Sequence, residues 1–308
     1  MRHDELSSIF PEFLRTTMEA WKIDTENLQE IRIRAERPVL ALCGNREYRS
    51  KTAVKKAQLQ EILAYLSGYS LYAYEDEIRQ GYLSLPGGHR VGIAGRAVVE
   101  RGKIRTVTDV SSLNIRFAHE VKGCADRLLP WIRKEDGLLH TLIVSAPGHG
   151  KTTLLRDCIR QVSDGEPGYP GLTVGVVDER SEIAGSFRGV PGNDVGLRTD
   201  VLDGCPKAEG MMMLIRSMAP KVVAVDEIGS REDMEALTLA VNCGCVVVAT
   251  VHGSSMEELK RKPVLREMVE TGIFERYVFL KASGKPGRLH RILDASGRPV
   301  GHQGEEGC

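Results

Sequence analysis

The chain has 308 residues, with 42 Lys and Arg residues balanced by 42 Asp and Glu residues. This length allows one large domain or two ordinary domains with separate cores. The even charge balance argues against a protein that holds nucleic acid mainly by bulk charge. No apolar run reaches the ~18 residues of a membrane-spanning helix, and no signal peptide is recognised. We therefore expect a cytoplasmic protein with no integral membrane segment.

Seven scattered cysteines without a C-x-x-C pair indicate reduced thiols, and they favour neither a disulfide framework nor a zinc site.

Residues 1–135 predict a smaller mixed α+β domain. Strands are expected at 28–34 and 39–43, and a helix over 58–79 with a break near Gly68. Further short strands are expected at 81–86, 89–99, 103–107 and 112–117, because turn signals such as Thr108-Asp109 separate them. This part of the chain is predicted to be a meander packed on the helix.

Residues 136–308 predict an α/β domain with a C-terminal hairpin. Strands at 141–144, 173–178, 222–225 and 245–251 alternate with helices at 152–162, 207–218 and 231–242. Near-continuous apolar strands are typical of a mainly parallel sheet that is covered on both faces. The hairpin is expected over 276–300 with its turn at 283–287, and the Pro- and Gly-rich stretch 164–171 is expected to be an exposed loop.

The segment 141–155, TLIVSAPGHGKTTLL, has the pattern of a nucleotide phosphate site: an apolar strand, a glycine-bearing loop and a helix. Glycines tolerate the positive φ angles with which backbone N–H groups surround a phosphate. Lys151 is expected to reach the β- and γ-oxygens, and Thr152 to bind Mg²⁺. Ser145 replaces the first glycine of G-x-x-x-x-G-K-[ST]. The predicted nucleotide-binding residues are Ser145, Ala146, Pro147, Gly148, His149, Gly150, Lys151, Thr152 and Thr153.

A second strand, in KVVAVDEIG, ends in Asp226 and Glu227. In a phosphate-loop protein Asp226 can hold Mg²⁺ and Glu227 can orient and deprotonate the water that attacks the γ-phosphate. The adjacent glutamate favours an ATP hydrolase over a kinase. The sequence therefore predicts a Mg²⁺-dependent ATPase, with ATP and Mg²⁺ as cofactors.

Other strand ends carry further candidates. Asp178, Glu179 and Glu182 can polarise water or bind metal, or can simply pair with nearby arginines. His252 follows the strand 245–251, where it can contact a γ-phosphate or be structural. An arginine can stabilise the negative charge on a transferred phosphoryl group. The candidates for this role are Arg90, Arg96 and Arg116 in the meander and Arg198 and Arg216 in the core.

Taken together, SAPGHGKTTLLRD, VVDERSEIAG, RTDVLDGCPKAEGM, VVAVDEIG and ATVHGSS resemble the stage III sporulation protein AA family of endospore-forming bacteria. That family is similar to the type II/IV secretion and pilus-retraction ATPases. The resemblance implies a RecA-like P-loop ATPase core, an acidic box at Glu179 or Glu182, a catalytic Glu227 and a His box at His252. Asp226 departs from the glycine that is common in secretion ATPases.

The same resemblance implies a motor that powers or assembles the channel complex between mother cell and forespore. It implies a homo-hexamer, membrane proteins of that complex as partners, and a location on the mother-cell side, peripheral at the forespore outer membrane. A RecA-like ATPase that depends on nucleic acid is the alternative, although the even charge and few aromatic residues argue against nucleic acid as a partner. A nucleotide-gated scaffold with little turnover also stays open.

Overall fold

The computed structural model describes residues 10–135, 137–281 and 287–300, and the chain forms two compact units. The first unit contains residues up to His119 together with Gly185–Gly192, and the second contains Glu120–Ala184 and the chain from Asn193 onward. The sequence placed the domain boundary at residue 135, whereas the compact units divide after residue 119. Segment 185–192 belongs to the first unit because Phe187 packs against its core.

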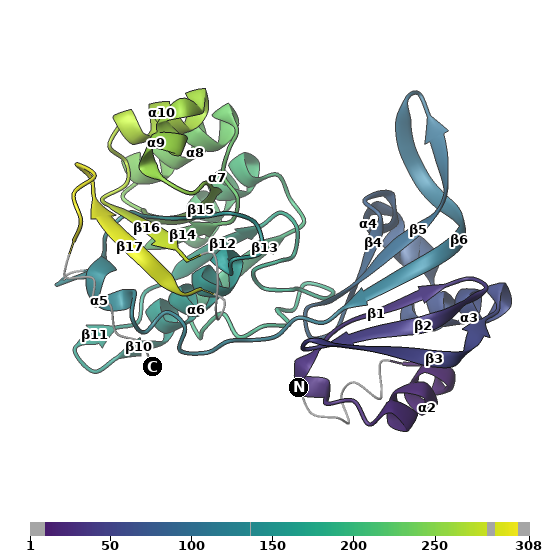
Figure 1. The fold of residues 1–308 in the computed structure, drawn as a ribbon. Coiled ribbons are helices and arrows are strands. Elements are labelled where there is room, and N and C mark those ends of the chain that lie inside the picture. The colour runs from purple at the N-terminus through teal and green to yellow at the C-terminus, as the bar shows by residue number, and fades with distance from the viewer. Residues whose placement is uncertain (1–9, 136, 282–286, 301–308) are drawn as a thin grey trace. The chain divides into compact units, whose positions relative to one another are not determined.

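The first unit is built on a six-stranded antiparallel sheet in the order β3-β2-β1-β6-β5-β4 (Figure 1). Alternation along β1 buries Leu28, Ile31 and Ile33, which join Leu59 and Ile62 of α3 in one core. The strands are β1 (Leu28–Arg34), β2 (Arg37–Cys43), β3 (Arg46–Val54), β4 (Tyr82–Leu85), β5 (His89–Glu100) and β6 (Lys103–Arg116). The helices are α2 (Glu12–Trp21), α3 (Lys56–Leu66) and α4 (Glu75–Arg79), with 3-10 turns at Thr25–Asn27 and Leu71–Tyr74.

The sequence missed strand β3 and helix α2 in this unit. The helical stretch expected over 58–79 with a break near Gly68 is α3, a 3-10 turn and α4, and the interruption falls at 67–70. The expected strands 103–107 and 112–117 are one strand, β6. The Thr108-Asp109 pair is an irregularity within it, because the backbone at Asp109 has a φ of 45° and Gly95 allows β5 to approach. A Cβ atom at Gly95 would lie only 2.6 Å from the carbonyl oxygen of Thr108.

The second unit contains a seven-stranded sheet in the order β13-β12-β14-β15-β9-β16-β17, parallel except for β17, which is antiparallel to β16. Its strands are β9 (Thr141–Ser145), β12 (Val174–Asp178), β13 (Thr199–Asp203), β14 (Val222–Val225), β15 (Val246–His252), β16 (Arg276–Leu280) and β17 (Leu289–Asp294). Its helices are α5 (Leu129–Ile132), α6 (Lys151–Asp164), α7 (Lys207–Met218), α8 (Arg231–Asn242), α9 (Met256–Arg261) and α10 (Pro263–Glu270).

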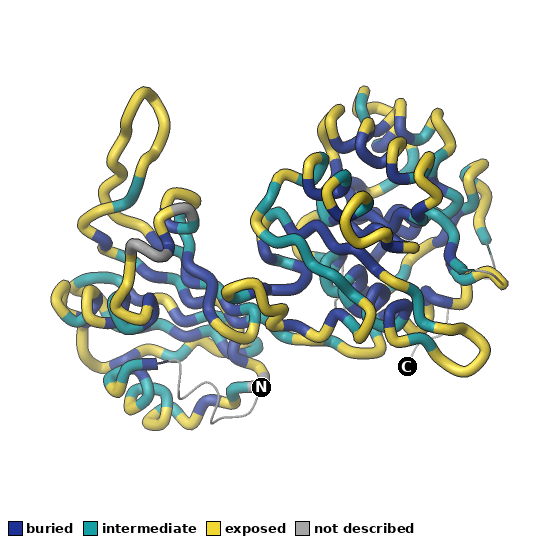
Figure 2. Tube along the Cα trace, turned by 180° about the vertical axis from the view of Figure 1, so that it is seen from behind, coloured by how far each residue is buried: buried dark blue, intermediate teal, exposed yellow. Residues whose placement is uncertain are grey.

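Helices cover both faces of this sheet. Ile143 of β9 shares a core with Leu154 and Ile159 of α6, whereas its neighbour Leu142 shares the opposite core with Met211 of α7. Strands β9, β12 and β14 are buried along their whole length, as a doubly covered parallel sheet requires (Figure 2). Because β9, β12, β14 and β15 are parallel, their carboxyl ends meet at one edge of the sheet.

Some elements of the second unit were missed or differ. Strand β13 and helices α9 and α10 were not predicted. The expected loop 164–171 contains two short paired strands, β10 (Gly165–Glu166) and β11 (Tyr169–Pro170), and a similar pair is formed by β7 (Arg133–Lys134) and β8 (Gly137–Leu138). The expected turn of the C-terminal hairpin lies outside the described residues at 283–286. Within the described ranges, no helix is long and apolar enough to cross a membrane.

Candidate nucleotide-binding site

The loop between β9 and α6 has the geometry expected of a phosphate-binding loop. Gly148 and Gly150 have φ angles of 78° and 85°, a backbone region that disfavours other residues. Open space faces Gly148, where an added Cβ would meet no atom within 4 Å. Gly150 is the N-cap of the 14-residue helix α6, so the positive end of the helix dipole lies at this loop. The backbone N–H groups of the loop and the start of the helix are together suited to an anion.

Lys151, the first residue of α6, is 4% exposed. Its Nζ atom lies 3.4 Å from the carbonyl oxygen of Ala146 and 2.9 Å from Nδ1 of His252. Burial lowers the pKa of Lys151, while the negative charges of Asp226, Glu227 and Glu182 act in the opposite direction. An anion at the loop would further stabilise the charged form of this lysine.

Asp226 is held by two threonine hydroxyls from different elements. Thr152 Oγ1 on α6 donates to Oδ2 of Asp226 at 2.5 Å, and Thr250 on β15 donates to Oδ1. The Thr250 oxygen also accepts the backbone N–H of Glu227 at 2.9 Å. Thr250 is fully buried, and the sequence analysis did not single it out. A hydroxyl near the end of a buried apolar strand, opposite the Asp-Glu pair, is the signal that could have identified it.

Glu227 lies between two basic groups. One carboxylate oxygen is 3.1 Å from Arg180 Nη1, and the other is 2.9 Å from Nε2 of His252. An ammonium group can only donate, so Nδ1 of His252 accepts from Lys151 and Nε2–H of the same ring donates to Glu227. His252 therefore connects the lysine of the phosphate loop to the candidate catalytic glutamate. The φ angle of Glu227 is 54°, a costly conformation for glutamate.

The three acidic candidates after β12 differ in their surroundings. Asp178 is buried and accepts the backbone N–H groups of Glu182, Ile183 and Ala184 at 2.8, 3.0 and 2.8 Å. Burial raises the pKa of Asp178 despite these hydrogen bonds, and its role is to shape the turn. Glu179 forms an ion pair with Lys207 of α7. Asp178, Glu179 and Glu182 all line one small cavity together with Asp226 and Glu227.

Arg156 is a second residue that the sequence analysis missed. It lies on α6, and its guanidinium donates to the carbonyl oxygens of Ile183 and Glu182 at 2.5 and 2.6 Å. Arg156 thereby ties the acidic turn to the helix that follows the phosphate loop. No sequence motif marks it, although its position five residues after Lys151 places it on the same helix.

The arginine candidates divide between the two units. Arg90, Arg96 and Arg116 belong to the first unit, where the guanidinium carbon of Arg90 lies 4.3 Å from the centre of the Tyr82 ring and Arg96 and Arg116 are exposed. In the second unit Arg198 donates to the carbonyl oxygen of Ser163 at 2.8 Å, which is a structural contact. The catalytic role of Arg90, Arg96 and Arg116 remains a prediction.

The oxygen ligands of Asp226 and Thr152 fit Mg²⁺, which usually binds one or two carboxylates together with substrate phosphates. Among the described residues, no group of three or more His, Cys, Asp or Glu side chains could hold a metal ion. A Mg²⁺ ion at Asp226 and Thr152 would therefore need phosphate oxygens as further ligands. The site as a whole unites the glycine-bearing β9–α6 loop, a carboxylate of the kind that binds Mg²⁺ and a candidate general base at one sheet edge.

Comparisons with known proteins identify the family. A model of the family described as sporulation stage III, protein AA matches residues 1–300. The chain is 41% identical over 295 residues to the stage III sporulation protein AA of Bacillus subtilis (strain 168), and the match covers 96% of each chain.

Two solved structures show the fold. The ATPase DotB of Legionella pneumophila has a TM-score of 0.60 at 16% identity, over 94% of this chain and 79% of DotB. The pilus retraction motor PilT, solved with bound ADP, has a TM-score of 0.59 at 15% identity, over 92% of this chain and 82% of PilT. These likenesses confirm the predicted fold class, an α/β core with a mainly parallel sheet like that of the ATPases DotB and PilT, preceded by a smaller mixed α+β part. With its sequence match across nearly the whole length, the chain belongs to the sporulation stage III protein AA family.

Proposed function

We propose that this protein binds ATP at the β9–α6 loop and hydrolyses it. One observation carries the proposal. Lys151 and Thr152 lie beside Asp226 and Glu227 at one sheet edge, although the two pairs are about 75 residues apart in the chain. The glycine conformations of the loop support phosphate binding through backbone N–H groups. Lys151 would bind the β- and γ-phosphates in place of its long contact with Ala146.

Mg²⁺, held by Thr152 and Asp226, would neutralise charge that develops on the phosphate oxygens. Glu227 is the proposed general base for the attacking water. Its carboxylate is oriented by His252 and Arg180, and its main chain by Thr250. His252 touches both Lys151 and Glu227. A phosphate that draws Lys151 away from His252 would therefore change the hydrogen bond between His252 and Glu227.

The proposed cellular role follows from the family. We infer a motor of the secretion-ATPase type that powers or assembles the channel complex between mother cell and forespore. It would act as a homo-hexamer on the mother-cell side and dock on membrane proteins of that complex. This inference is an analogy of fold, because PilT, which shares the fold, is a pilus retraction motor.

The site is tested by two substitutions with opposite signatures. Lys151→Ala should lose nucleotide binding, measured with a fluorescent ATP analogue, because the loop loses its only buried cation among the described residues. Glu227→Gln should keep binding but lower phosphate release by about a hundredfold or more, since an amide cannot accept the proton. Lys221→Ala, at an exposed position before β14, serves as the control.

Turnover by Lys151→Ala at the parental rate would rule out the phosphate-loop assignment. A Glu227→Gln chain that hydrolyses ATP normally would remove Glu227 from the mechanism. Stimulation of the parent by single-stranded DNA or RNA would instead support the nucleic-acid-dependent alternative.

A further inference from the structure

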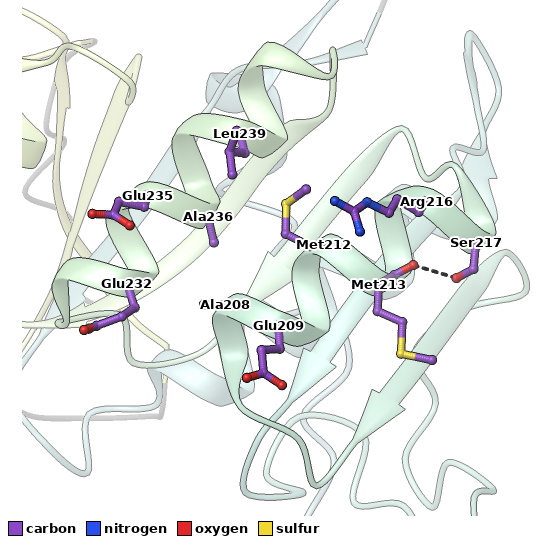
Figure 3. Close-up of a pocket in the computed structure, with 10 residues that line it drawn as sticks. All are labelled: Ala208, Glu209, Met212, Met213, Arg216, Ser217, Glu232, Glu235, Ala236 and Leu239. Carbon is purple, nitrogen blue, oxygen red and sulfur yellow. Dashed lines mark hydrogen bonds between the residues drawn. The ribbon is translucent and has the colours of Figure 1, made fainter.

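A hydrophobic groove lies between α7 and α8 (Figure 3). It has a volume of about 710 Å³, which is within the range of established binding sites. Met213 is 61% exposed and Leu239 is 46% exposed, so the apolar lining is not covered by the second unit itself. Exposed methionines adapt their shape to a partner. The groove is lined by Ala208, Glu209, Met212, Met213, Arg216, Ser217, Glu232, Glu235, Ala236 and Leu239.

The charges around this groove are mainly negative. Glu209 on α7 and Glu232 and Glu235 on α8 line the groove together with one cation, Arg216 (Figure 3). Arg231 lies 3.9 Å from Glu235, but both side chains are exposed, so the pair contributes little. The occupant that fits is therefore apolar at its centre and basic around it.

The first unit carries a segment with those properties, the β5–β6 arm, which we define as residues 96–108. Both strands are paired to their ends by the Val99–Ile104 and Glu100–Lys103 pairs. Figure 1 shows the arm extending beyond the rest of its own sheet, and Figure 2 shows it as almost wholly exposed. Val99 is 61% exposed and Ile104 is 49% exposed. The arm is therefore a two-stranded ribbon that carries exposed apolar side chains.

One face of the arm is apolar and its surroundings are basic. Ala97 and Val99 are two apart on β5 and share a face, and they pair with Val107 and Ile104 across a register shift between Val98 and Val99. Val107 is partly buried against the core of the first unit, so the exposed apolar side chains of this face are Val99 and Ile104. The charged residues of the arm are Arg96, Arg101, Lys103 and Arg105 against a single acid, Glu100. The arm is thus complementary to the α7–α8 groove in both polarity and charge.

We propose that the β5–β6 arm of one copy of this chain docks in the α7–α8 groove of a second copy. Val99 and Ile104 would cover Met212, Met213 and Leu239. Lys103 and Arg105 would face Glu232 and Glu235. The contact joins two different surfaces of the chain, so it is a heterologous interface, the kind from which closed rings are built. This interface rests on the homo-oligomeric ring of the proposed function and would hold that ring together. It requires no ATP hydrolysis.

The first test reverses charges and then restores them. Glu232→Lys/Glu235→Lys and Lys103→Glu/Arg105→Glu should each weaken self-association by about tenfold or more in sedimentation velocity, because like charges then face each other. A mixture of the two variants should associate within about threefold of the parent, since opposite charges meet wherever the arm of one variant contacts the groove of the other. Glu267→Lys/Glu270→Lys on the exposed face of α10 is the matched control and should associate like the parent.

A photo-crosslink maps the contact without disturbing the groove. Benzoylphenylalanine at position 99 of the purified full chain should give a covalent dimer whose crosslinked peptide maps to α7 or α8. The dimer should form equally with a Lys151→Ala chain, so loss of ATPase activity and loss of the interface are distinguishable. Crosslinks confined to one chain, dimer crosslinks that map elsewhere, or a parent that stays monomeric at every concentration would each overturn the proposal. Failure of the charge-restored mixture to associate would do the same.

Discussion

The buried hydroxyl of Thr250 offers a direct test of how the candidate site is held together. Thr250→Val keeps the shape of the side chain but removes its hydroxyl. Two hydrogen bonds are lost: the one to Asp226 Oδ1 and the one from the backbone N–H of Glu227, which is 2.9 Å long. Asp226 keeps its 2.5 Å hydrogen bond from Thr152. Both Asp226 Oδ1 and the N–H of Glu227 lose the Thr250 partner, but Asp226 is only half-buried, so the larger cost is expected at the N–H.

The expected cost follows from these contacts. A buried N–H that loses its partner costs about 1–3 kcal/mol, and the added methyl group recovers only part of this. We therefore expect the second unit to lose about 2 kcal/mol. For a unit of this size, a loss of 1 kcal/mol lowers the melting temperature by about 2–4 °C. Thr250→Val should melt about 4–8 °C below the parent.

The assay is thermal unfolding followed by calorimetry, with Thr250→Ser as the matched variant. Serine keeps the hydroxyl and loses only the methyl group, so its melting temperature should lie between those of the parent and the valine variant. If the proposed function is right, Thr250→Val should also slow hydrolysis more than it weakens ATP binding, because Glu227 loses its main-chain anchor. A valine variant that melts with the parent would refute the assigned hydrogen-bonding role.

Three further outcomes are expected from the structure. Burial lowers the pKa of His89 to about 4, so the unfolded chain takes up a proton that the folded chain does not. The free energy of unfolding of the first unit should therefore be highest above pH 6.5 and fall by about 3 kcal/mol toward pH 4. His89→Gln should make this free energy, measured by urea unfolding, depend less on pH. Gly210→Ala should cost about 1–3 kcal/mol in denaturant unfolding, because its Cβ would lie 2.6 Å from both Cys205 Sγ and Val177 Cγ1; a stability equal to the parent would contradict this packing. Asp178→Asn should lower the melting temperature of the second unit, because an amide offers one oxygen to the three N–H groups that the carboxylate accepts; an unchanged temperature would count against the turn-shaping role.

The sequence determined those features whose geometry is local. The buried strand β9, the two glycines and the helix that begins at Lys151 are contiguous, and the steric demands of each residue are visible in the residue itself. The continuous apolar runs of β12 and β14 likewise predicted a doubly covered sheet, because a half-exposed strand would alternate. Local patterning also misled, since Thr108-Asp109 has the composition of a turn but lies within β6.

Only the tertiary structure decided which side chains meet. The strand β13 was missed because its half-buried residues lack the apolar run of the other strands, and its place beside β12 depends on the sheet order. The bridge from Lys151 through His252 to Glu227 joins residues 101 positions apart. The support of Asp226 and Glu227 by Thr250 likewise depends on β15 lying beside β14.

The sequence also did not predict that residues 185–192 belong to the first unit. Gly192 fits there because the backbone of Gly87 and Gly88 approaches it too closely for a side chain. The physical reason is common to all these cases. Periodicity and glycine conformation act over a few residues of chain, whereas the partner of a hydroxyl, a carboxylate or an imidazole is set by strand order and packing between segments that sequence spacing does not encode.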